Sequence, residues 1–84
     1  MRNTKNQLNE KSVYNHILKE WQISEELSRL KKLPLKKLGV SVLEINWLLN
    51  TMEGEYQCHI TDNNVSLSMP LENFVQIIMQ ANMK

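Results

Sequence analysis

Leu38-Gly39-Val40-Ser41-Val42-Leu43-Glu44 opens the most apolar helix that the sequence predicts. Gly39 has no Cβ and can turn the chain. Ser41, with Glu44 three residues later, fits a capping box in which each side chain accepts a hydrogen bond from a backbone N–H. The apolar residues that follow recur at helical spacing, and they are Ile45, Leu48, Leu49 and Met52. The spacing predicts a helix with one buried face that begins at Ser41 and ends at Gly54.

Amphipathic helices are predicted on both sides of this one. The first covers residues 8–21, in which one apolar stripe is spaced by four residues: Val13, Ile17 and Trp21. The last follows Pro70, a residue type favoured at the first helical position. Its buried face is predicted to contain Leu71, Phe74, Val75 and Ile78. A short helical turn over residues 63–67, capped by Asp62, completes the set.

Residues 23–39, between the first two long helices, are predicted to form a long loop with a few turns. Pro34 argues against a continuous helix there. Five leucines pin the loop to the core, and they are Leu27, Leu30, Leu33, Leu35 and Leu38. No stretch shows a convincing period of two, so no strand is predicted. We therefore expect an all-α fold, an antiparallel four-helix bundle over residues 8–84, preceded by a disordered polar tail over residues 1–7.

Composition limits the classes of function. The chain has 84 residues, a formal net charge of +1, and 23% charged residues, so the molecule as a whole has no strong field. Cys58 is the only cysteine, which excludes an internal disulfide and suits a reducing compartment. No run approaches the ~20 apolar residues that a membrane span needs, and the N-terminus lacks the apolar stretch of a secretory signal. We expect a cytoplasmic protein that does not engage a membrane.

The order of these elements resembles the acyl carrier protein family, without a gap, from about Glu10 to Ile78. Leu38-Gly39 resembles the Leu-Gly ahead of the family's attachment site, and Leu43 resembles the Leu after it. Other matching segments are Ile23 to Leu27, Glu53 to Tyr56, Ile60 to Asp62 and Leu71 to Ile78. The resemblance implies a role in fatty-acid, polyketide or related acyl metabolism, without catalysis by the chain itself. Its implied partners are acyl-pathway enzymes or another carrier protein.

The attachment motif departs from the family. The family's motif reads Leu-Gly-x-Asp-Ser-Leu, and its Ser carries 4'-phosphopantetheine; here Ser41 falls on the Asp and Val42 on the Ser. Because Val has no hydroxyl, the resemblance implies an atypical carrier without the cofactor at the usual position. Phosphopantetheine on Ser41 is the alternative. It is disfavoured because a one-residue shift turns a helix position by ~100° and because a capping hydroxyl is engaged by the backbone.

Partner contacts are predicted at and before the second long helix. Trp47 lies off the apolar stripe, and a partly exposed Trp is a frequent interface anchor, although packing on the long loop is an equal interpretation. Asn46 and Asn50 lie where the family usually shows acidic and apolar recognition residues. Lys36 and Lys37 precede the helix. An alternative function is a non-carrying interaction module that uses this helix and Trp47 to bind an enzyme or a true carrier.

A helix-turn-helix DNA-binding protein is the further alternative. Residues 38–41, followed by Ile45 and Leu48, resemble its turn and recognition helix. Phosphate contacts would come from a basic run, made of Arg29, Lys31, Lys32, Lys36 and Lys37. Pro34 interrupts the required first helix, however, and the recognition helix has no Arg or Lys to read base edges. Nucleic-acid binding therefore ranks third.

No catalytic or metal site is predicted. His16, Cys58 and His59 are too few and too poorly spaced for a structural zinc site. Cys58 and His59 are neighbours in sequence, but no third group that would orient them as nucleophile and base is evident. The only glycines are Gly39 and Gly54, which excludes a glycine-rich phosphate loop.

Overall fold

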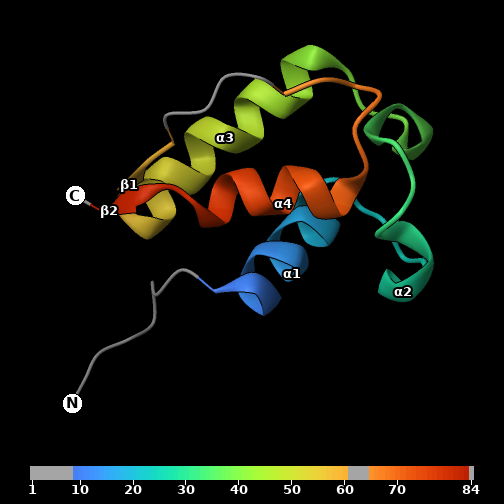
Figure 1. Ribbon diagram of the computed structural model, residues 1–84, viewed down its shortest axis with the longest axis horizontal. Helices are drawn as coiled ribbons and strands as arrows, with labels where there is room; N and C mark the ends of the chain where they lie inside the picture. Colours follow the sequence, from blue (N-terminus) through green and yellow to red (C-terminus); the bar gives the residue numbers. More distant parts are fainter. Residues whose placement is uncertain (1–8, 61–64, 84) are drawn as a thin grey trace.

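Helices account for most of the residues that the computed structural model describes, which are 9–60 and 65–83 (Figure 1). The α-helices are α1 (Glu10–Glu20), α2 (Leu27–Leu30), α3 (Val42–Tyr56) and α4 (Leu71–Met79), with a 3-10 helix, η1, over Leu35–Leu38. Two short strands, β1 (Cys58–His59) and β2 (Asn82–Met83), pair antiparallel. The described residues are therefore mostly helical, as predicted. The expected tail over residues 1–7 and the expected cap Asp62 lie outside them.

Helix α1 begins where a side chain satisfies its first turn. Asn9 is the N-cap, and its side-chain oxygen accepts a hydrogen bond from the Ser12 N–H at 2.9 Å. The helix ends at Glu20, one residue before the predicted end. Its buried residues are Val13, Tyr14 and Ile17. Two residues of the predicted stripe, Val13 and Ile17, are therefore buried, whereas Trp21 follows the helix and is half-buried.

Helix α3 runs past its predicted end. Gly54 lies inside the helix, so the prediction that it stops α3 is wrong. The helix continues to Tyr56, which is buried, and Gln57 then takes the left-handed conformation with φ of 55°. Burial of the Tyr56 ring adds core contacts, which compensate for a cap without glycine. The buried face contains Ile45, Leu48, Met52 and Tyr56, with Leu49 at its half-buried edge.

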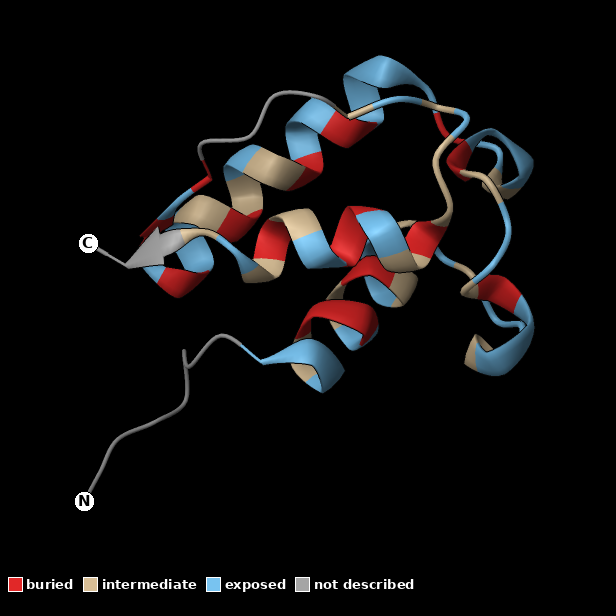
Figure 2. Ribbon diagram, in the orientation of Figure 1, coloured by how far each residue is buried: buried red, intermediate tan, exposed pale blue. Residues whose placement is uncertain are grey.

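Helix α4 lies between α1 and α3 in Figure 1. Its buried residues are Leu71, Phe74, Val75 and Ile78, all predicted. Trp21, directly after α1, stacks on Phe74 with ring centroids 6.1 Å apart and planes 17° apart. The Gln76 side chain donates to Glu10 at 3.0 Å, so α1 and α4 also share a polar contact. Buried residues recur along all three long helices (Figure 2), so the core lies among them.

Backbone hydrogen bonds hold the loop between α1 and α3 against the start of α4. Leu30 and Leu35 are buried, so the predicted pinning by leucines is confirmed at these two positions. In addition, the first N–H groups of α4 donate to the carbonyl oxygens of Lys31 and Leu33, at 3.0 and 2.9 Å. Any helix begins with N–H groups that lack intrahelical partners, and α4 has no side-chain cap. The loop therefore supplies the cap of α4.

Two predicted features of the second half of the chain are corrected. Residues 65–67, the described part of the predicted helical turn 63–67, are not helical. The short fourth helix is instead α2, before α3. A strand pair exists where none was expected, with Cys58 opposite Met83 and His59 opposite Asn82. Two residues per strand are too few to produce an alternating pattern in a sequence. Within the described residues, no helix combines the length and apolar character needed to cross a bilayer.

Candidate functional site

The predicted attachment region is the first turn of α3. Gly39 closes η1 with φ of 80°, a left-handed conformation that glycine adopts without strain. Ser41 then caps α3: its Oγ accepts from the Glu44 N–H at 3.3 Å, and the Glu44 carboxylate accepts from the Ser41 N–H at 2.9 Å. The predicted capping box is confirmed. The Ser41 hydroxyl, the cofactor site of the alternative interpretation, is therefore engaged with the backbone.

Val42 is the first residue of α3 and 57% of it is exposed. Because Val42 is mostly exposed, its side chain contributes little to the core. Core packing therefore does not explain why an apolar residue occupies this position. Val42 forms one wall of a cavity of about 240 Å³ between α3 and the segment before α4. The other residues that line this cavity are Ile45, Asn46, Leu49, Val65 and Leu67. Val42 thus lies at the leading tip of α3, beside a mostly apolar hollow.

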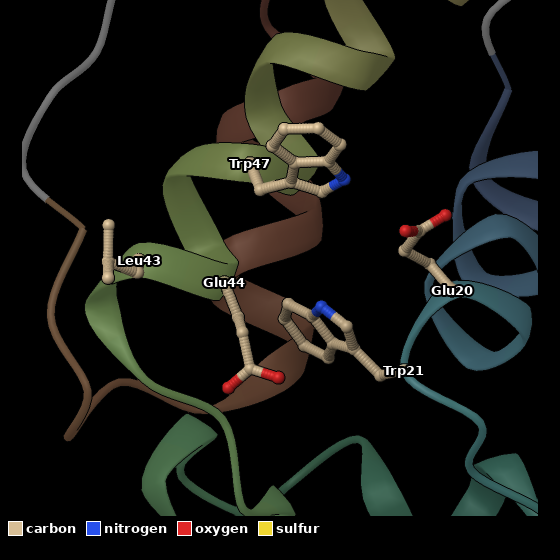
Figure 3. A pocket seen from close by; sticks show the side chains of 5 residues that line it. All are labelled: Glu20, Trp21, Leu43, Glu44 and Trp47. Atoms are coloured by element: carbon tan, nitrogen blue, oxygen red, sulfur yellow. The ribbon is translucent and has the colours of Figure 1, made fainter.

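A second cleft lies between α1 and α3 and holds both tryptophans of the chain (Figure 3). Its volume is about 360 Å³, and it is lined by Glu20, Trp21, Leu43, Glu44 and Trp47. Leu43 and Trp47 are one turn apart on α3 and are 79% and 66% exposed. The predicted exposure of Trp47 is confirmed, and its predicted alternative, packing on the long loop, is not its main environment.

The two tryptophans differ in how firmly they are held. Trp21 is half-buried, because one side of its indole stacks on Phe74 of α4. In Figure 3 it points from α1 toward α3, while Trp47 extends from α3 with its ring nitrogen toward Glu20. Glu20 on α1 and Glu44 on α3 line the cleft from opposite helices, and the Glu44 carboxylate points toward the start of α3, where it accepts from the Ser41 N–H. The cleft therefore combines apolar aromatic walls with negative charge.

The structure divides the predicted partner contacts among different surfaces. Trp47 lines the cleft toward α1, whereas Asn46 lines the hollow beside Val42. Asn50 is exposed on α3, and Lys36 and Lys37 are exposed on η1, but these three line neither cavity. The five residues therefore do not line one common cavity among those described.

Part of the basic run has partners within the protein. Lys31 is half-buried, and its Nζ lies 5.4 Å from the centre of the Tyr14 ring. Lys32 forms an exposed ion pair with Glu72 at 3.5 Å. Arg29 is exposed. The exposed side of α3 meanwhile presents Leu43, Glu44 and Trp47 rather than cations, which is unfavourable for reading DNA bases.

Cys58 and His59 point to opposite sides of β1. The Cys58 side chain is buried, with its Sγ 3.9 Å from the Met52 carbonyl oxygen, whereas His59 is exposed and its Nδ1 lies 3.7 Å from a Glu53 carboxylate oxygen. Neighbouring residues of a strand alternate in this way. The pair is thus not arranged as nucleophile and base. Among the described residues there is no group of three or more His, Cys, Asp or Glu that could hold a metal ion.

Sequence reasoning found the exposed Trp47 but missed the cleft around it. Trp21 was assigned to the buried stripe of the first helix, and it does contact the core. Its position directly after the last helical residue, Glu20, is the signal that it can also reach sideways from the end of α1. Comparisons with family models, with curated proteins and with solved structures give no match.

Proposed function

We propose that this chain is an atypical acyl-carrier-protein-like domain of acyl metabolism, which docks on a partner protein through α3 and carries no phosphopantetheine at residue 42. The observation that carries the proposal is the place of Val42. It is exposed at the leading tip of α3, in the slot that the motif assigns to the modified Ser. The site has the accessibility that a prosthetic arm requires, but it lacks the hydroxyl that would bear the arm.

The order of elements supports the carrier-like bundle in this proposal. A first long helix, a long connection, a second long helix and a final helix follow one another as α1, residues 21–41, α3 and α4. Helix α3 has its N-terminus, and not its middle, at the residues that resemble the attachment motif. The short helix differs from the expected place, so the resemblance is carried by the three long helices.

Exposed apolar residues support docking as the role that replaces carrying. Val42, Leu43 and Trp47 lie within the first two turns of α3, and each is more than half exposed. Large exposed apolar groups that gather on one helix are typical of interaction sites. Partner enzymes that recognise a carboxylate-rich helix would find few such groups here, since Asn46 and Asn50 take up the neighbouring exposed positions.

The experiment is incubation of the wild-type protein with coenzyme A and a broad-specificity phosphopantetheinyl transferase, followed by intact mass measurement. We expect no added phosphopantetheine. A genuine carrier protein in the same reaction serves as the positive control. An adduct that disappears in Ser41→Ala would contradict the proposal, because it would show that the capping hydroxyl leaves the backbone and accepts the cofactor.

A further inference from the structure

We propose that the groove between α1 and α3 binds a cationic amphipathic helix of the partner protein, with its apolar residues against Trp21 and Trp47 and its lysine or arginine residues against Glu20 and Glu44. This inference rests on the proposed docking role of α3, and it assigns the chemistry of the partner.

Part of the apolar wall of the groove is already held in place in the free protein. Trp21 is fixed by its stacking on Phe74, so ordering its side chain costs the complex little additional entropy. Trp47 contributes an indole that is 66% exposed in the free protein. Burial of these two rings and of Leu43, which is 79% exposed, would remove a large apolar area from water. Indole faces also attract the cationic groups of lysine and arginine.

The charge of the groove selects a cationic occupant. Glu20 and Glu44 line the cleft, and Glu55 and Lys19 line its continuation, so the carboxylates outnumber the one ammonium group. All four residues are exposed. The chain as a whole has a formal net charge of +1, so this negative region is opposite in sign to the molecule that bears it. The basic run over residues 29–37 lies on another segment and lines neither end of the groove. An anionic or neutral helix would leave Glu20 without a counter-charge when water is displaced, and would leave Glu44 with only its hydrogen bond from the Ser41 N–H.

The groove is long enough for a helix rather than for a single side chain. A further cavity of about 380 Å³ continues from the tryptophan cleft along α1 and α3, and the two cavities share Glu20. Its lining residues are His16, Lys19, Glu20 and Glu55. Helix α1 has 11 residues, which corresponds to about 16 Å, so a partner helix of three turns would match it. Docking of an amphipathic helix in such a groove is a common mode of peptide recognition.

The chain offers a direct readout, because its only two tryptophans both line the cleft. The probe is a helical peptide of about 14 residues, made of leucine and lysine with all leucines on one face. A leucine and glutamate peptide of the same pattern is its control. At physiological salt, we expect the lysine peptide to shift both indole N–H signals in NMR spectra saturably, with one peptide per chain, and the glutamate peptide to shift neither.

Matched variants distinguish binding of the lysine peptide in the groove from non-specific charge attraction to the rest of the protein. Glu20→Gln with Glu44→Gln should weaken binding of the lysine peptide by about tenfold, since two charge contacts are lost. Glutamine at residue 44 preserves the capping box. Glu25→Gln with Glu26→Gln removes the same charge from exposed residues outside the groove and should change the affinity by less than about twofold. Trp47→Ala should weaken binding, and Trp47→Phe should restore part of it.

Three results would overturn the inference: no saturable binding of the lysine peptide, equal binding of both peptides, or equal weakening in the two double variants. Self-association of the free chain that is lost in Glu20→Gln with Glu44→Gln would assign the groove to a second copy instead. These failures are distinct from failure of the proposed function, because the transferase reaction reads residues 41 and 42 and does not involve the groove.

Discussion

Ser41 and Glu44 satisfy each other's backbone at the start of α3. The Glu44 N–H donates to Ser41 Oγ at 3.3 Å, and the Ser41 N–H donates to the Glu44 carboxylate at 2.9 Å. Two N–H groups that a helix leaves without partners are thereby paired. Ser41, directly before Val42, consequently has a structural role that explains its presence without any modification.

Ser41→Ala should lower the free energy of unfolding by about 1 kcal/mol, the usual effect of losing an N-cap. Ser41→Asp should keep most of the stability, because an aspartate also caps helices well. Urea denaturation followed by circular dichroism measures both. Ser24→Ala, at an exposed residue outside the helices, is the control and should stay within about 0.5 kcal/mol of the wild type. Equal stability of Ser41→Ala and the wild type would show that the cap is unimportant.

Leu48 and Leu43 test which face of α3 belongs to the core. Leu48 is fully buried, so Leu48→Ala should lower the free energy of unfolding by about 2–5 kcal/mol. Leu43 lies on the same helix but is 79% exposed, and Leu43→Ala should change it by less than about 0.5 kcal/mol. Equilibrium denaturation of the two variants provides the comparison. A similar loss for both would mean that the face assigned to docking is part of the core.

The two glycines should respond to alanine with opposite signs. Gly39 has φ of 80°, so Gly39→Ala forces an L side chain into the left-handed region and should cost about 1 kcal/mol. Gly54 lies inside α3, and a Cβ there would meet nothing within 4 Å. Gly54→Ala should therefore stabilise the protein by roughly 0.5–1 kcal/mol. Melting temperatures would show the difference, and destabilisation by Gly54→Ala would instead support its role as a helix stop.

Two buried tyrosines should make stability fall at alkaline pH. Burial raises the pKa of Tyr14 and of Tyr56 above the usual 10.0, and nearby carboxylates add to the rise, those of Glu10 and Glu72 at Tyr14 and that of Glu55 at Tyr56. Above pH 10 the unfolded chain therefore loses its tyrosine protons first. The tyrosine contribution to the free energy of unfolding is fully present below that pH and is lost as the pH rises toward the folded pKa values.

Urea midpoints between pH 8 and pH 11 test this expectation for Tyr14 and Tyr56. The tyrosine contribution is the difference between the wild type and the variant Tyr14→Phe with Tyr56→Phe, because both proteins share the lysines that titrate in the same range. The wild type should lose stability more steeply. Parallel curves for the two proteins would contradict the assigned cause.

Local features of this fold were predictable from the sequence, because they depend on neighbouring residues. The capping box at Ser41 and the buried stripes of the long helices follow from side-chain chemistry and helical period alone. The end of α3 was mispredicted because a glycine signal was outweighed by burial of Tyr56, which only the packed protein reveals. The strand pair was not predicted because it joins Cys58–His59 to residues far along the chain. The segment after α2 likewise makes its backbone hydrogen bonds with the start of α4.

The candidate site was only half predictable for a similar reason. The exposure of Trp47 follows from its place off the apolar stripe of α3. Its approach to Trp21 and Glu20 depends on how α1 lies beside α3, and no sequence spacing encodes that geometry. The backbone bonds from α4 to Lys31 and Leu33 are likewise invisible in side-chain patterns, because main-chain groups are the same at every residue.

We propose that residue 42 occupies the slot of a carrier attachment site. The variant Ser41→Asp with Val42→Ser recreates the family motif while keeping a residue that can cap α3. After incubation with coenzyme A and a broad-specificity phosphopantetheinyl transferase, intact mass and peptide mapping should show one phosphopantetheine on residue 42 of this variant and none on the wild type. A folded variant that stays unmodified, in a reaction that fully modifies a genuine carrier protein, would contradict the claim.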